Sequence, residues 1–368
     1  MALLSADAIL WPLGARMKHR SRRIRCLAGL FVGLIAGLGA AAPSPAKAAP
    51  VRVVADQRLT VATPAGSGAL ALYLSGEWDR PRPTVTRAIV TIHGVLRDAD
   101  TDRAIAEAAR AAANVAPQSV LLIEPQFLNE ADVAFRHLQT ETLHWSHSGW
   151  EGGGEALGPA SISSFTALDA ILARLANHAL FPALKTVVIA GHSGGGQVVQ
   201  RYAVAGRGEA SLTKAGIHVR YLVANPSSYV YFSPERPTGD GFAAIDGAAC
   251  PAYDRWKYGM TGLPPYLAGE DAAALEAAYA ARDVVYLLGS ADNDPNHPAL
   301  DKTCMAEAEG PNRYARGLAY FRYLRWRHPT DLRQRLRQAP GVGHDGAGMF
   351  SSICGLAALY DLPGCDGD

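Results

Sequence analysis

Lys185-Thr186-Val187-Val188-Ile189-Ala190 runs directly into Gly191-His192-Ser193-Gly194-Gly195, and this stretch decides the fold. This run is mostly apolar and rich in β-branched side chains, which predicts a buried strand. Residues 197–203 then have the pattern of the first turns of a helix. A G-x-S-x-G sequence between a strand and a helix makes a sharp turn, and its glycines allow the unusual dihedral angles that the turn needs. This context predicts that the hydroxyl of Ser193 projects from the turn as a nucleophile.

A nucleophilic serine needs two further groups, and the chain offers them in a defined order. A base must remove the serine proton, and a carboxylate must orient that base. The strand expected at 217–223 leads into a loop without a carboxylate, whereas the strand expected at 283–288 leads into a loop with Asp292 and Asp294. His344 follows in the last polar loop before a C-terminal helix. Serine, acid and histidine therefore occur in that order along the sequence.

This set of motifs resembles the serine α/β-hydrolases, a superfamily that includes esterases and lipases. The resemblance spans residues 51–360 and rests on Gly191 to Gly195, Gly289-x-x-Asp292, Gly343-His344-Asp345-Gly346 and Ile92-His93-Gly94. It implies the α/β-hydrolase fold, with a mostly parallel eight-stranded sheet flanked by helices. It also implies a cap insertion at 226–281, between the sixth and seventh strands. The hydrolase domain is expected at 49–368.

By the same resemblance, Ser193 is the nucleophile, His344 is the general base and later the general acid, and Asp292 is the carboxylate that orients His344. Asp294 remains an alternative to Asp292, although an Asp before a proline commonly caps a turn. Asp345 adjoins His344 in sequence and is badly placed to reach the far nitrogen of its ring. We therefore interpret Asp345 as structural.

The negative oxygen that forms during acyl transfer needs two N–H donors. One is expected from Gly194, whose amide lies at the start of the helix that follows the serine. The other is expected from the loop after the third strand, 88–92, and we assign it to Val95. The sequence reads His-Gly-Val-Leu here, not a longer glycine run, which leaves Leu96 open as the donor. His93 is interpreted as a hydrogen-bonded structural residue.

The rest of the chain alternates strand and helix patterns, which argues for a parallel sheet with both faces covered. A further buried strand is expected at 119–123, and helices are expected at 103–113 and 163–176. Three segments near the start of the domain are expected to form leading antiparallel strands: 51–54, 59–62 and 69–74.

Two segments interrupt this alternation, and substrate specificity is expected there. Residues 124–159 contain Trp145, Trp150 and a run of three glycines. Residues 226–281 end in an Ala-rich helix pattern at 271–281. They also contain many aromatic residues among prolines and glycines, including Tyr229, Tyr231, Phe232, Tyr253, Trp256, Tyr258 and Tyr266. Aromatic rings over a serine site suggest an apolar or ring-bearing acyl or alcohol group. Simple packing of the cap onto the core is an equally good interpretation of these rings.

Residues 1–48 have the composition of a signal peptide. A stretch rich in Lys and Arg precedes an apolar run at 26–38, and Ala46-Lys47-Ala48 then forms a typical cleavage site. We expect removal at this point and export to the periplasm or the medium. A permanent membrane anchor is the alternative, but the apolar run is shorter than the ~20 residues that a span needs. The true start, Met1 or Met17, is left open.

The net charge and the cysteines indicate which partners and which compartment to expect. The whole chain has a net charge of +1, but its first 48 residues hold seven of the 35 Lys and Arg and one of the 34 acids. The remainder carries about −5 and offers no basic face for nucleic acid. Four of the five cysteines lie beyond residue 48, so export makes disulfides possible. Cys354 and Cys365 close a short loop around the last helix, which leaves Cys250 to pair with Cys304.

These observations predict an exported serine hydrolase that cleaves carboxylic esters through an acyl-enzyme. The expected substrate is a small-molecule or polymer ester, and no cofactor or metal is required, since no zinc-type ligand spacing occurs. His137, His144 and His147 are interpreted as loop residues. An acyltransferase with the same triad and a non-catalytic binding protein with this fold are the alternatives. Motifs do not separate the first two, because acceptor choice depends on how the cap excludes water. No membrane span is expected after signal removal, and the sequence does not indicate the oligomeric state.

Overall fold

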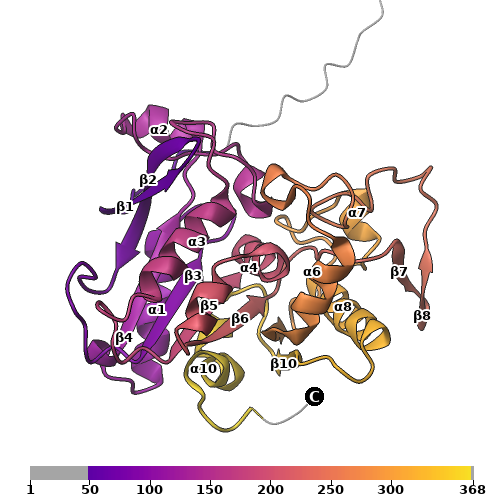
Figure 1. Cartoon of the computed structure of the whole chain (residues 1–368). Coiled ribbons are helices and arrows are strands. Elements are labelled where there is room, and N and C mark those ends of the chain that lie inside the picture. The colour runs from indigo at the N-terminus through magenta and orange to yellow at the C-terminus, as the bar shows by residue number, and fades with distance from the viewer. Residues whose placement is uncertain (1–48, 366–368) are drawn as a thin grey trace, which may run out of the picture. The chain divides into compact units, whose positions relative to one another are not determined.

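An eight-stranded sheet forms the centre of the fold, in a computed structural model that describes residues 49–365 (Figure 1). The predicted signal peptide, 1–48, lies outside the described residues. The strand order is β1-β2-β4-β3-β5-β6-β9-β10; β1 and β2 pair antiparallel, β2 and β4 pair antiparallel, and all other neighbours are parallel. The strands are β1 (Gln57–Thr63), β2 (Gly66–Leu74), β3 (Arg87–Ile92), β4 (Val120–Gln126), β5 (Thr186–His192), β6 (His218–Ala224), β9 (Asp283–Gly289) and β10 (Arg335–Ala339).

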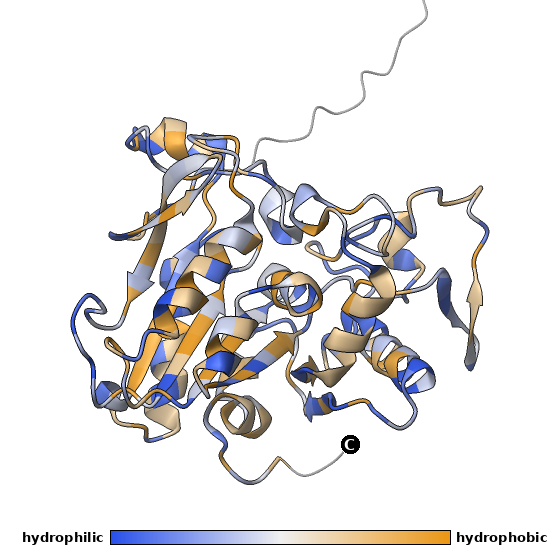
Figure 2. Cartoon of the chain, in the orientation of Figure 1, coloured by the Kyte–Doolittle hydropathy of each residue, from blue (hydrophilic) through white to orange (hydrophobic). Residues whose placement is uncertain are grey.

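Apolar side chains on both faces of the central strands explain why the sheet is buried between helices. Along β5, Val187 and Ile189 belong to the core on one face, while Val188 and Ala190 belong to the core on the other. This alternation follows from the two-residue period of a strand. In Figure 2 the central strands of the sheet are coloured as strongly hydrophobic.

Helices cover each face of the sheet. One core contains residues of α3 (Ser164–Leu175), α4 (Gly194–Ala205), α5 (Glu209–Lys214), α6 (Ala272–Ala281) and α8 (Arg313–Arg327). The other contains residues of α1 (Ala99–Ala112), α9 (Gly346–Ser351) and α10 (Ile353–Tyr360). The predicted mostly parallel eight-stranded sheet flanked by helices is therefore confirmed. Within residues 49–365, no helix is both long and apolar enough to cross a bilayer.

Two details of the expected sheet are wrong. Residues 51–54 do not form a strand; the amide of Val51 instead donates to Oδ1 of Asp132, at 2.8 Å. The eighth strand is β10, which the sequence pattern does not reveal. Its side chains read Arg-Leu-Arg-Gln-Ala, and only Leu336 and Ala339 are buried, because β10 is an edge strand of the sheet.

The segment between β6 and β9 has its own local structure. It contains a two-stranded antiparallel sheet of β7 (Glu235–Thr238) and β8 (Gly241–Ala244), the short helix η3 (Pro265–Leu267), and α6, which Asp271 caps. Of its aromatic residues, Tyr229, Tyr231, Phe232, Tyr258 and Tyr266 are buried. Their main role is thus packing, and they do not line an exposed surface. That residues 226–281 form a cap over the serine stays a prediction.

The segment 124–159 is also ordered. It holds α2 (Glu130–Arg136), which begins with a reciprocal capping box between Asn129 and Asp132, and the short helix η2 (Gly149–Gly152). Trp145 and Trp150 are fully buried. Phe127 lies between them, stacked on Trp150 with ring centroids 5.6 Å apart and edge-on to Trp145 at 5.2 Å. Trp150 also contacts His93, the residue after β3, with ring centroids 4.6 Å apart, which connects the segment to the end of that strand.

Two disulfides lie in the described residues. Cys250 is bonded to Cys304, which begins the short helix α7 (Cys304–Glu307), and Cys354 is bonded to Cys365. The first joins the β6–β9 segment to the chain that follows β9. The second closes the C-terminal turn onto α10.

Candidate active site

Ser193 occupies the sharp turn between β5 and α4. Its backbone has φ 58° and ψ −121°, a conformation that residues other than glycine rarely adopt. The amide of Ser193 donates to the carbonyl of Ala224 at the end of β6, 3.0 Å away, which anchors the turn to the sheet. The turn leaves the serine side chain partly exposed at the carboxyl edge of the sheet.

The glycines around Ser193 are required by close backbone packing. A Cβ atom on Gly195 would lie 1.9 Å from the carbonyl oxygen of Ile92, at the end of β3. A Cβ atom on Gly191 would lie 2.4 Å from the carbonyl group of Gly195. Side chains at either position would therefore displace α4 from the sheet, and with it the turn that presents the serine.

His344 bridges Ser193 and Asp292. Its Nε2 atom lies 2.9 Å from Oγ of Ser193, and its Nδ1 atom lies 2.7 Å from Oδ2 of Asp292. Since Nδ1 faces a carboxylate, it carries the ring proton, and Nε2 is left to accept the serine proton. Asp292 follows β9 and His344 follows β10. The structure thus brings together, at one edge of the sheet, three side chains that are far apart in sequence.

Asp292 is held as a carboxylate. It is only 3% exposed, and burial alone would raise its pKa. The hydrogen bond to His344, the charge on that ring and the charge of Arg313 together outweigh burial, so the pKa of Asp292 lies below its usual value. An ionised acid at this position stabilises a positive charge on the imidazole.

Arg313, at the start of α8, lies near the carboxylate oxygen of Asp292 that does not face His344. It is fully buried, and one of its terminal nitrogens lies 3.4 Å from Oδ1 of Asp292. Its Nε donates to Oγ of Ser227 at 2.9 Å, and its other terminal nitrogen donates to the carbonyl of Ala299 at 2.5 Å. The sequence offers no signal for this contact, because the residue lies 21 positions beyond Asp292 in a helix that the apolar pattern does not reveal.

Two more histidines contact the ring of His344. His192 lies 4.5 Å away between ring centroids, and His297 lies 4.9 Å away. Burial lowers the pKa of His192 to about 3, and the charge of His344 acts in the same direction. Burial and the charge of Arg313 also lower the pKa of His297. Both rings are therefore neutral near pH 7, so they pack against His344 without adding charge.

Asp294, the alternative to Asp292, and Asp345, interpreted as structural, make other contacts. Asp294 is exposed, and its Oδ1 accepts a hydrogen bond from the amide of Asn296 at 2.8 Å. Asp345 caps α9, accepting from the amide of Ala347 at 3.0 Å. Both serve local turns, and it is Asp292 that faces the imidazole.

The loop after β3 lies against the start of α4. A Cβ atom on Gly194 would lie 3.0 Å from the amide nitrogen of Val95 and 2.9 Å from its Cγ1, so the Val95 amide adjoins Gly194. The Leu96 side chain is 70% exposed. His93 is buried: its Nε2 accepts from the amide of Phe127 at 2.9 Å, and burial lowers its pKa to about 4. A neutral, hydrogen-bonded His93 fits its expected structural role.

Metal binding receives no support from the part of the chain between residues 49 and 365, where no group of three or more His, Cys, Asp or Glu side chains is arranged to hold an ion. His144 has its Nδ1 atom 3.0 Å from the carbonyl oxygen of Thr142.

Comparison with known proteins bears on the fold. No protein-family model matches the sequence, and no curated protein matches it either. Among solved structures, poly(aspartic acid) hydrolase-1 from Sphingomonas sp. KT-1 is similar, with a TM-score of 0.56 and 21% identity, over 85% of this chain and 99% of that one. LpqC, a poly(3-hydroxybutyrate) depolymerase from Bordetella parapertussis, is similar with a TM-score of 0.56 and 22% identity, over 83% of this chain and 91% of that one. This chain therefore has the α/β-hydrolase fold that its motifs predict.

Proposed function

We propose that the protein is an exported serine hydrolase that cleaves carboxylic esters with Ser193, His344 and Asp292. The observation that carries this proposal is the pair of contacts made by His344, 2.9 Å to the serine hydroxyl and 2.7 Å to the carboxylate. A hydroxyl, an imidazole and a buried carboxylate in this geometry can deprotonate the hydroxyl at neutral pH. The strained turn at Ser193 adds support, because such strain is typical of functional sites.

The proposed reaction has two halves. Ser193 Oγ attacks the ester carbonyl as its proton passes to Nε2 of His344, and the tetrahedral oxyanion is held by the amides of Gly194 and Val95. The C–O bond to the alcohol then breaks, the alcohol oxygen takes the proton from His344, and an acyl-enzyme remains. Water attacks this acyl-enzyme with His344 again as base, which releases the acid and restores the serine. Asp292 stays ionised throughout and balances the imidazolium charge.

The surroundings of the serine favour an acyl group with apolar character. Val95 and Leu96 expose 39% and 70% of their surface on the loop that adjoins Gly194. Apolar side chains beside a polar catalytic centre are typical of sites that bind organic substrates. The two similar structures carry the names of enzymes that act on polymers, a polyamide in one case and a polyester in the other. Both kinds of polymer therefore belong in the substrate panel beside small esters.

Export is proposed on two grounds. Residues 1–48 have the order of regions found in signal peptides. The two disulfides suit an oxidising compartment, since cytosolic thiols are kept reduced.

A panel of p-nitrophenyl esters of increasing acyl length, together with poly(3-hydroxybutyrate) and poly(aspartic acid), tests the proposal. We expect turnover of at least one ester, and Ser193→Ala is expected to abolish that turnover. Addition of an alcohol distinguishes transfer from hydrolysis, because an acyltransferase would form the new ester in preference to the free acid. Ester turnover that survives in Ser193→Ala contradicts the proposed mechanism.

A further inference from the structure

A large pocket lies at the end of the sheet opposite to Ser193. Its volume is about 760 Å³, within the range of small-molecule sites. It is bounded by the first residues of three strands, His218 of β6, Asp283 of β9 and Arg335 of β10. The proposed catalytic residues follow the other ends of the strands, and a seven-residue strand spans about 20 Å. The pocket is therefore separate from the proposed active site.

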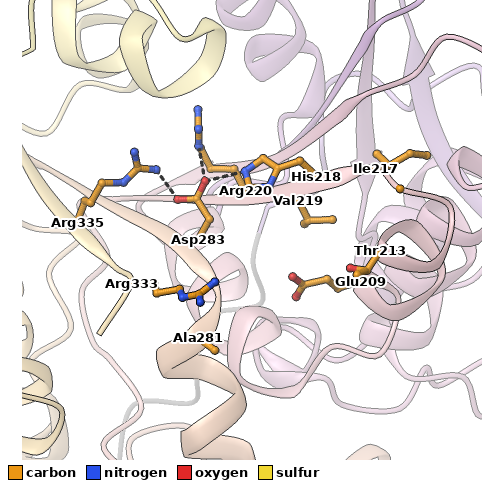
Figure 3. Close-up of a pocket in the computed structure, with 11 residues that line it drawn as sticks. Glu209, Thr213, Ile217, His218, Val219, Arg220, Ala281, Asp283, Arg333 and Arg335 are labelled. Atoms are coloured by element: carbon orange, nitrogen blue, oxygen red, sulfur yellow. Dashed lines mark hydrogen bonds and ion pairs between the residues drawn. The ribbon is translucent and has the colours of Figure 1, made fainter. Parts of the chain in front are cut away.

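Basic side chains surround Asp283, one of the two carboxylates that line this pocket (Figure 3). Asp283 accepts hydrogen bonds from Nε of Arg220 and Nε2 of His218, each at 2.9 Å, and it also contacts Arg335. Burial acts to raise the pKa of Asp283, but these neighbours lower it overall. The negative charge of Asp283 is thus already shared among three cationic or hydrogen-bonding partners.

The second carboxylate of the pocket is also engaged. Glu209, on α5, lies 2.6 Å from Nε of Arg282, which sits just before β9, and it accepts a hydrogen bond from the hydroxyl of Tyr221 at 3.0 Å. Neither acid of the lining is therefore without a partner. Positive charge beyond these pairs is therefore not neutralised by an acid of the pocket lining.

Arg333 supplies that additional charge. Its side chain is exposed and lines the pocket, and no residue between 49 and 365 forms an ion pair or hydrogen bond with its guanidinium. In Figure 3, dashed lines join Asp283 to its basic neighbours, and none reaches Arg333. A guanidinium presents five N–H donors in a planar arrangement that matches a carboxylate or a phosphate.

A smaller pocket continues this basic surface. It has a volume of about 230 Å³, shares Arg220 and Arg335 with the first pocket, and adds Arg337. Arg335 and Arg337 occupy alternate positions of β10, so they project on the same side of the strand. The two pockets adjoin at Arg220 and Arg335, and together they are called the basic groove. The one carboxylate that the smaller pocket adds, Asp361, is already paired with Arg220 and Arg87.

We propose that this groove binds a small molecule that carries an oxyanion group, a carboxylate or a phosphate, with Arg333 as its principal charged contact and Arg335 as a second. The bonds of Asp283 hold Arg335 and Arg220 in place before the ligand arrives, which lowers the entropic cost of binding. The site does not depend on the proposed hydrolase reaction, because it includes none of the proposed catalytic residues.

Isothermal titration calorimetry of the purified protein at low ionic strength, with inorganic phosphate and with citrate as separate probes, tests this proposal. Arg333→Ala should weaken binding about tenfold or more, as expected for the loss of a charge-assisted hydrogen bond. Arg80→Ala is the matched control, since Arg80 is an exposed arginine in the loop between β2 and β3. It should bind both probes as the unmodified protein does.

The outcomes separate cleanly. Binding of citrate alone assigns a carboxylate ligand, binding of phosphate alone assigns a phosphate ligand, and binding of both assigns a general oxyanion site, provided that Arg333→Ala weakens it. The proposal is overturned if neither probe binds at concentrations up to about 10 mM, or if Arg333→Ala and Arg80→Ala bind equally well. Ester turnover, measured in parallel, should stay within about twofold in both variants, because surface substitutions away from a site have small effects.

Discussion

Replacing Asp292 by Asn isolates the contribution of one negative charge to the proposed reaction. Oδ2 of Asp292 lies 2.7 Å from Nδ1 of His344, in a site where the acid is 3% exposed. At an effective dielectric constant near 20, two unit charges at this separation attract by about 6 kcal/mol. This attraction is present only when His344 is positively charged, in the transition states of both half-reactions. A barrier raised by about 6 kcal/mol lowers kcat by about 10⁴-fold.

The structure also provides a matched control for this substitution. Asp294→Asn removes the same charge two residues away, on an exposed side chain that caps a turn. We expect its kcat to stay within about threefold of the unmodified enzyme. The assay is initial-rate hydrolysis of a p-nitrophenyl ester at neutral pH, with thermal unfolding of each variant recorded to show that it is folded. A folded Asp292→Asn enzyme with more than a tenth of normal kcat, or a larger loss in Asp294→Asn, would refute the reasoning.

Three further predictions concern the support of the site and the stability of the fold. Arg313→Gln removes the charge that helps to keep the pKa of Asp292 low, so this pKa should rise in an NMR titration of the Asp292 carboxyl group. The exposed Arg325→Gln on the same helix should leave the pKa of Asp292 unchanged, and an equal rise in both variants would argue against the contact with Arg313. Gly195→Ala places a methyl group 1.9 Å from the carbonyl oxygen of Ile92, so it should lower the free energy of unfolding in urea by about 3 kcal/mol. In the control Gly94→Ala the added methyl group has nothing within 4 Å, and the free energy of unfolding should change by less than about 0.5 kcal/mol. Equal losses in the two variants would argue against the close packing of this turn. Replacing Cys250 and Cys304 by Ser should lower the free energy of unfolding by about 4 kcal/mol, and replacing Cys354 and Cys365 should lower it by about 3 kcal/mol. The two values differ because the closed loops span 54 and 11 residues. A melting temperature that is the same with and without reductant would contradict both values.

The sequence predicts the fold well where local chemistry dictates structure. The strand-turn-helix around Ser193 is visible because β-branched residues, glycines and helix formers follow one another within 20 positions. The expected strands at 88–92 and 283–288 correspond to β3 and β9. Such strands are buried on both faces, so their continuous apolar runs stand out in the sequence.

Buried residues that depend on polar partners cannot be recognised from the sequence pattern in the same way. The first turn of the helix α8 buries Arg313 and Arg316, so the apolar period that normally reveals a helix is missing from its start. The edge strand β10 carries Arg335 and Arg337 and has the same difficulty. Arg313, which supports Asp292, could be found only from the three-dimensional arrangement.

The aromatic residues of 226–281 show a different limit of sequence reasoning. A tyrosine that lines a binding surface cannot be distinguished in the sequence from one that packs in a core. In the structure Tyr229 and Tyr231 are fully buried, and Tyr229 stacks on Tyr320 of α8 at 4.5 Å. Only knowledge of α8 could have assigned these rings to packing.

The central claim, that Ser193 is an activated nucleophile, is tested most directly by a fluorophosphonate probe and peptide mass spectrometry of the modified protein. The account predicts one covalent adduct, on Oγ of Ser193, and its complete absence in Ser193→Ala. A folded protein that takes up no probe, or one that is labelled at another residue while Ser193 stays free, would contradict it.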